Sequence, residues 1–117
     1  MKFLIVEDEV IIALALKQFL GSRGYTDVHV VHSGEDALAW VQDHRPDVVL
    51  MDIFLSGGMD GIETSMSINE KFATPIIFIS GNVESLENRT LPSKHAVLAK
   101  PVVFNKIVVA LDTLLAS

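Results

Sequence analysis

The sequence predicts a three-layer α/β fold, a doubly wound (βα)5 arrangement in which helices cover both faces of a parallel sheet. Five short apolar runs alternate with segments of helical length, and this alternation is typical of βα repeats joined by right-handed crossovers. Most runs are rich in β-branched residues and apolar on both sides, as expected for strands buried on both faces of a sheet. The runs are Phe3–Val6, Val28–Val31 (interrupted by His29), Val48–Met51, Ile76–Ile79 and Ala96–Ala99.

Helix signals occupy the segments between the runs. Ser33 has the side chain of an N-cap for the second helix, while Asp60 and Glu63 are expected in the first turn of the third. The segment 82–94 is the poorest helix, because it contains Asn88 and Pro92. The apolar positions expected to face the sheet are Ile12, Leu16, Phe19, Leu38, Val41, Ile62, Met66, Ile68, Phe72, Val103, Ile107, Ala110 and Leu114.

Composition narrows the classes of protein. A length of 117 residues fits one domain, so residues 1–117 are expected to form a single unit without a separate output domain. With 9 basic and 15 acidic residues the formal net charge is −6, which disfavours nucleic acid as a partner. The absence of cysteine agrees with a cytoplasmic location. The longest apolar run, Val10–Leu16, is too short to cross a membrane.

Chemically active side chains follow four of the five predicted strands. Glu7–Glu9 follow the first strand, Asp52 ends the third, Ser80 ends the fourth, and Lys100 ends the fifth. Taken singly, each has a structural explanation, such as acids in a first helical turn or a lysine before a proline. Because parallel sheets gather function at the carboxyl ends of their strands, we expect these side chains to form one site.

The chemistry of this set suggests phosphoryl transfer. Clustered carboxylates repel one another unless a cation is present, and an all-oxygen ligand set favours Mg²⁺. A lysine and a hydroxyl beside the metal would hold phosphoryl oxygens. Asp52 could then act as the nucleophile and form an acyl phosphate. A phosphatase of the haloacid dehalogenase type would need a second acid two residues after Asp52, where this sequence has Phe54, so this class is disfavoured. A nucleotide-binding protein is also disfavoured, because the sequence has no phosphate-binding glycine motif.

Over nearly its whole length the sequence resembles the receiver domain of two-component response regulators. The similarity depends on Ile5–Glu9, on Met51–Ile53 with Met59–Glu63, on Ile79–Gly81, and on Lys100-Pro101. It implies a flavodoxin-like sheet of strand order 2-1-3-4-5 and a phosphorylated signalling domain rather than a separate enzyme. By position, it implies the following roles: Asp52 as phospho-acceptor, Asp8 as direct metal ligand, Glu7 as a ligand acting largely through water, Phe54 as a backbone carbonyl ligand, Ser80 as the switch hydroxyl and Lys100 as the phosphate-contacting lysine.

The resemblance also implies partners. A phosphohistidine on a sensor kinase or a histidine phosphotransfer protein would be the donor, and a downstream protein would receive the signal. The alternative is a phosphorelay intermediate or phosphate sink. A second apolar stripe on the last helix, formed by Phe104, Val108, Leu111 and Leu115, is interpreted as a broad core face, with a homodimer or partner surface as the alternative.

Three departures from the family pattern affect the expected mechanism. The segment before Lys94 is short of helix formers, so the fourth helix is expected to be short or mobile. Val97 stands where the family usually has an aromatic residue, so the usual aromatic switch is not expected to operate. The loop Leu55–Met59 lacks the common proline, is one residue longer than usual and contains the Gly57-Gly58 pair, which predicts a pliable loop.

Overall fold

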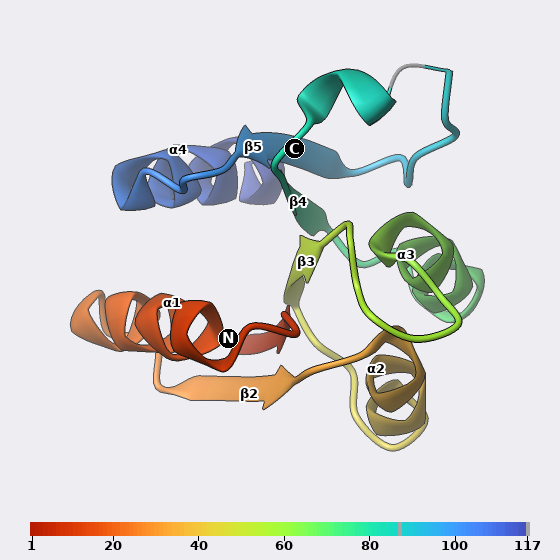
Figure 1. Cartoon of the computed structure of the whole chain (residues 1–117). Coiled ribbons are helices and arrows are strands. Elements are labelled where there is room, and N and C mark those ends of the chain that lie inside the picture. Colours follow the sequence, from red (N-terminus) through yellow and green to blue (C-terminus); the bar gives the residue numbers. More distant parts are fainter. Residues whose placement is uncertain (87, 117) are drawn as a thin grey trace.

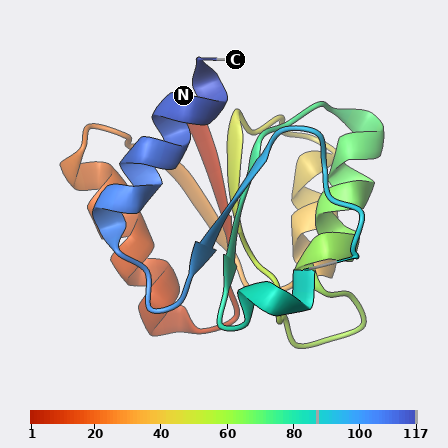
Figure 2. The same ribbon diagram turned by 90° about the horizontal axis from the view of Figure 1, so that it is seen from above.

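The computed structural model describes residues 1–86 and 88–116 and has the predicted three layers (Figures 1 and 2). The strands are β1 (Lys2–Val6), β2 (Asp27–Val31), β3 (Val48–Asp52), β4 (Ile76–Ser80) and β5 (His95–Ala99). The helices are α1 (Val10–Ser22), α2 (Gly34–Val41), α3 (Gly61–Lys71) and α4 (Phe104–Leu115), with a 3₁₀ turn, η1, at Val83–Leu86. No helix in the described ranges is both long and apolar enough to cross a bilayer.

The sheet has the strand order expected from the resemblance. All pairings are parallel, and the order is β2-β1-β3-β4-β5. Figure 2 shows α1 and α4 on one face of the sheet and α2 and α3 on the other. The strand order reverses between β1 and β3, so the carboxyl ends of these two strands adjoin the crevice where such sheets bind ligands.

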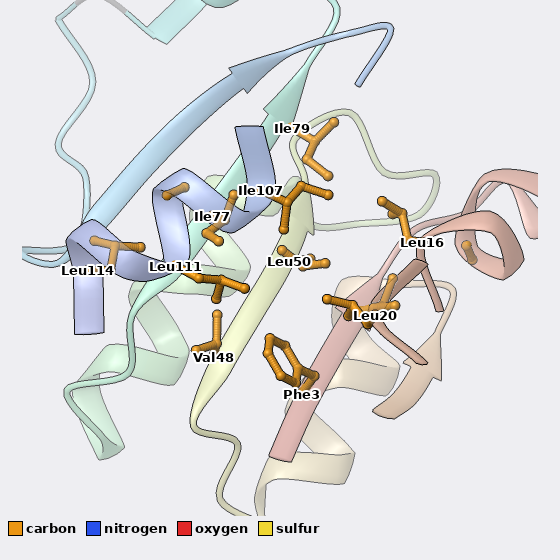
Figure 3. Packing of buried hydrophobic residues seen from close by; sticks show 13 residues of the cluster. Phe3, Leu16, Leu20, Val48, Leu50, Ile77, Ile79, Ile107, Leu111 and Leu114 are labelled. Atoms are coloured by element: carbon orange, nitrogen blue, oxygen red, sulfur yellow. The ribbon is translucent and has the colours of Figure 1, made fainter. Parts of the chain in front are cut away.

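Two apolar clusters hold the layers together, one on each face of the sheet. On the face covered by α1 and α4, side chains such as Phe3, Leu50 and Ile77 pack against Leu16 and Leu111 (Figure 3). On the other face, Phe78 and its neighbours pack against α2 and α3. Burial of each large apolar side chain stabilises the fold by about 1.5–3 kcal/mol. Because each face of the sheet has its own apolar cluster, the central strands are apolar on both faces, as predicted.

Helix faces differ in detail from the predicted stripes. In α1 the buried residues are Ala13, Leu16 and Leu20, whereas Ile12 and Phe19 are only partly buried. The reason is that the helix is rotated so that Ala13, rather than a larger side chain, faces the sheet. In α2, by contrast, the Ser33 hydroxyl accepts a hydrogen bond from the Asp36 N–H, which confirms the predicted N-cap.

The expected fourth helix of the (βα)5 pattern is the main correction. Between β4 and β5 the described residues contain only η1, so the structure has five strands but four α-helices. Asn88 adopts a positive φ of 67° and Pro92 follows it, and both features oppose a continuing helix. Residue 87 of the predicted segment lies outside the described residues.

The second stripe of α4 is divided between the core and the surface. Leu111 is buried, which confirms the core interpretation for that residue. Phe104 packs against Phe19 of α1 with ring centroids 4.9 Å apart and ring planes tilted by 33°, and Leu115 is exposed. A homodimer surface on the exposed part of this stripe stays a prediction, which sedimentation at increasing protein concentration would test.

Gly61 at the start of α3 is required by close packing. Its N–H donates to the Ile53 carbonyl at 2.7 Å, and a Cβ at this position would collide with the Asp52 carbonyl oxygen and lie 2.8 Å from Ile53 Cα. Because these neighbours are backbone atoms of a buried strand end, they cannot move aside. We expect Gly61→Ala to lower the free energy of unfolding by about 3 kcal/mol, measured by urea denaturation.

Gly21 provides the matched control, because a Cβ there meets nothing within 4 Å. It lies in the last turn of α1, so Gly21→Ala should be neutral or stabilise by up to about 1 kcal/mol. Equal losses in the two variants would refute the packing explanation.

Candidate functional site

The register of the central strands brings the predicted site residues to one edge of the sheet. Val6 pairs with Met51, so Glu7 and Asp52 follow at the same level on adjacent strands. Asp52 pairs with Ile79, one residue before Ser80. Ser80 pairs with Ala99, and the Lys100 N–H donates to the Ser80 carbonyl at 2.8 Å. Four separate strand ends therefore lie at the same edge of the sheet.

Three carboxylates and one ammonium group form the centre of the site. Each of Glu7, Asp8 and Asp52 offers a carboxylate oxygen, and the three oxygens lie within 4.8 Å of one another. Glu7 and Asp52 are only 1% and 3% exposed. Lys100 Nζ lies 3.3 Å from Asp52 Oδ1 and 3.6 Å from Glu7 Oε1, so it is the counter-charge of this buried pair.

This environment shifts the protonation of the site. Burial, together with the facing Asp52 carboxylate, raises the pKa of Glu7 to about 8. Burial alone would raise the pKa of Asp8. Hydrogen bonds from Glu7 and from the Ser56 N–H together outweigh this effect, so the pKa of Asp8 lies below its usual value. Burial alone would lower the pKa of Lys100. The negative charges of Asp52 and Glu7 outweigh this effect and raise the pKa above its usual value. Without a metal ion, Glu7 therefore keeps its proton at neutral pH.

The donor set fits a hard divalent cation. Within the described ranges, the buried atoms Glu7 Oε1 and Asp52 Oδ1 have no hydrogen-bond partner. Lys100 Nζ supplies a single positive charge for these two oxygens, at 3.3 and 3.6 Å, so a further cation would compensate the second carboxylate. All the converging ligands are oxygen atoms, which is the preference of Mg²⁺ rather than of Zn²⁺. The residues present are therefore suited to the metal that the sequence analysis predicts.

Ser80 and Phe54 lie at the margins of this centre. Ser80 is fully buried, and its Oγ accepts a hydrogen bond from the Asn82 N–H at 3.0 Å. Phe54 is the second residue after β3, and it is 58% exposed. The role of its carbonyl as a metal ligand stays a prediction. Val97 lies in β5 opposite Phe78 and packs against the cluster on the α2 and α3 face.

The loop after β3 ends in a helix cap that was not predicted from the sequence. Asp60 is the N-cap of α3 rather than a first-turn residue, and it forms a capping box with Glu63. Arg89 forms an ion pair with Asp60 at 3.3 Å, which ties the segment after η1 to this cap. The Asp-x-x-Glu spacing was the signal that could have identified the box.

An apolar cleft that was not predicted from the sequence adjoins the site. It measures about 500 Å³ and lies between α1 and the segment that follows β5. Lys100 lines one part of it, and Ile11, which is 83% exposed, lines another. Val10 and Leu14 are also exposed on α1. The phosphate-contacting lysine predicted from the sequence thus borders an uncovered apolar surface.

Comparisons with known proteins agree with this geometry. Residues 3–112 match the family described as "Response regulator receiver domain", and the chain belongs to that family. It is similar to the signal receiver domain of a modulated diguanylate cyclase from Desulfovibrio desulfuricans, with 34% identity, a TM-score of 0.87, and coverage of 98% of this chain and 93% of that chain.

Two further solved structures are similar over nearly their full length. A response regulator receiver protein from Sinorhizobium medicae has 25% identity and a TM-score of 0.89, with coverage of 100% of this chain and 95% of that one. The receiver domain of the response regulator PhyR from Erythrobacter litoralis has 29% identity and a TM-score of 0.85, with coverage of 98% and 89%. The predicted family and fold are therefore confirmed.

Proposed function

We propose that this receiver domain takes a phosphoryl group from a phosphohistidine onto Asp52 and passes the signal on by protein contact. The observation that carries the proposal is the buried Asp52 carboxylate, with Lys100 Nζ 3.3 Å away and two further acids beside it. We further propose that the chain acts as a single unit in the cytoplasm, and that its donor is a sensor kinase or a histidine phosphotransfer protein.

In the proposed reaction, an Asp52 carboxylate oxygen forms a bond to phosphorus as the bond from phosphorus to the histidine nitrogen breaks. Lys100 contacts the phosphoryl oxygens, and the Ser80 hydroxyl donates to one of them after leaving the Asn82 N–H. Glu7, Asp8 and Asp52 would hold Mg²⁺, with the Phe54 carbonyl as a further ligand. The cation supplies positive charge that stabilises the phosphoryl oxygens in the transition state. Glu7 must release its proton before it can serve as a ligand.

Acetyl phosphate tests this function without a partner protein. The wild-type chain is incubated with acetyl phosphate and Mg²⁺, and the intact protein is weighed by mass spectrometry. We expect a gain of one phosphoryl group in Mg²⁺ and none in EDTA. The added group should be removed by hydroxylamine, as expected for an acyl phosphate. The proposal fails if the wild-type protein gains no mass, or gains it equally in EDTA.

The apolar cleft supports a protein rather than a small molecule as the natural donor. Ile11 is exposed beside Lys100, so a helix of the donor that covers it would lie next to Asp52. We expect Ile11→Ala to slow transfer about tenfold from a phosphorylated histidine phosphotransfer protein that labels the wild-type chain. Labelling by acetyl phosphate should stay unchanged.

Val109→Ala is the matched control for this prediction. Val109 is 64% exposed on α4 but does not line the cleft, so its loss should leave both reactions unchanged. If Ile11→Ala slows both donors equally, or neither, the cleft is not the docking surface.

A further inference from the structure

The loop between β3 and α3 is held by side chains from two other parts of the chain. The Ser56 N–H donates to Asp8 Oδ2 at 3.3 Å, on the segment that follows β1. The Gly58 N–H donates to Glu35 Oε2 at 3.0 Å, in the first turn of α2. The loop that begins directly after Asp52 is therefore tethered at two points, one of them outside the acidic centre.

The Gly57-Gly58 pair is fitted to the Glu35 carboxylate. Gly57 has a φ of +105°, a conformation that residues with a Cβ rarely adopt. A Cβ on Gly57 would lie 3.4 Å from both Glu35 carboxylate oxygens, and a Cβ on Gly58 would lie 3.3 Å from Oε2. The carboxylate thus lies against the backbone of both glycines, where a Cβ on Gly58 would be a tight fit and one on Gly57 would be at ordinary contact distance.

We propose that Glu35 is a positioning residue for the acceptor site. Two adjacent glycines give a loop high conformational entropy, and each fixed contact reduces the number of conformations it can adopt. At its far end the loop is fixed by the Gly61 N–H, which donates to the Ile53 carbonyl. With Gly58 held by Glu35, the segment between Asp52 and Gly58, which includes the proposed carbonyl ligand Phe54, has fewer conformations to adopt beside Asp8 and Asp52. This inference rests on the proposed function for the identity of the site.

The role predicts a change in Mg²⁺ affinity rather than in the acceptor chemistry. In Glu35→Ala the loop loses one charge-assisted hydrogen bond, so the cation must order the loop when it binds. We expect Mg²⁺ binding, followed by amide NMR shifts, to weaken about tenfold. Labelling by acetyl phosphate should fall at low Mg²⁺ and return to the wild-type rate at saturating Mg²⁺. Without Mg²⁺, the Gly58 amide should exchange about tenfold faster with solvent.

Two variants separate positioning from charge. Glu35→Gln keeps an acceptor oxygen, so its Mg²⁺ affinity should stay within about twofold of the wild type. Asp36→Ala removes the same charge from the same exposed turn, and no hydrogen bond from the loop to the Asp36 side chain is present among the described residues. It should bind Mg²⁺ like the wild type.

Four results would overturn the role of Glu35, and three of them concern Glu35→Ala, Asp36→Ala and the wild type. They are an unchanged Mg²⁺ affinity in Glu35→Ala, an equal loss in Asp36→Ala, or a wild-type protein that binds no Mg²⁺. A loss in Glu35→Gln as large as in Glu35→Ala would also overturn it, because a charge effect would then be sufficient. If the wild type binds Mg²⁺ but takes no phosphoryl group, the proposed function fails while the Glu35 comparison still stands.

Discussion

Replacement of Asp52 by asparagine should abolish phosphoryl uptake and, without Mg²⁺, stabilise the fold at pH 8. An amide is not a nucleophile at this position, so no acyl phosphate can form. The substitution also removes one of two buried carboxylates that share the single ammonium group of Lys100. We expect the free energy of unfolding to rise by about 2 kcal/mol, as when a strained functional group is replaced. Intact mass and urea denaturation measure the two effects.

The matched control for Asp52→Asn is Asp60→Asn. Asp60 is an acid of the same loop region, but it caps α3 and lies outside the acidic group. It should accept wild-type amounts of phosphoryl group and be less stable, since a cap and an ion pair are weakened. If Asp52→Asn still gains a phosphoryl group, another residue is the acceptor.

Much of the site could be predicted because residues at the carboxyl ends of neighbouring parallel strands must lie close together in space. Four of the five predicted strands end at or directly before a functional residue, and parallel pairing must bring such residues to one edge. Glu7, Asp52 and Lys100 therefore needed no long-range information beyond the strand order, which the resemblance supplied. The packing of α1 was predicted less well, because Ala13 and Phe19 both suit a helix face and the rotation depends on the opposing strands.

The parts that sequence could not give depend on contacts between distant segments. The hydrogen bond from the Gly58 N–H to Glu35 joins residues 23 positions apart, and neither position alone carries a signal for it. The cleft beside Lys100 forms only where α1 meets the segment after β5. The missing fourth helix was indicated by poor helix formers, but only the structure shows that a single 3₁₀ turn replaces it in the described residues.

Without Mg²⁺, the free energy of unfolding should fall by up to about 4 kcal/mol as the pH rises from 5 to 8. Glu7 has a pKa of about 8 in the folded protein, against an ordinary pKa of 4.5 for the same carboxyl group outside the fold. Between these values the folded state binds more protons than the unfolded state, so stability decreases with pH. The raised pKa of Lys100 and the lowered pKa of Asp8 act outside this window. Urea denaturation at several pH values in EDTA measures the slope.

Glu7→Gln isolates the contribution of this one carboxyl group. The variant keeps every histidine of the wild type, so its remaining pH dependence is the background to subtract. We expect a nearly flat profile and, at pH 8, a more stable metal-free protein than the wild type. Added Mg²⁺ should stabilise the wild type more at pH 8 than at pH 5, because a cation beside Glu7 favours the ionised form. Parallel profiles for the wild type and Glu7→Gln would contradict a proton held in the buried centre, and with it the electrostatic argument that the proposed site takes a cation.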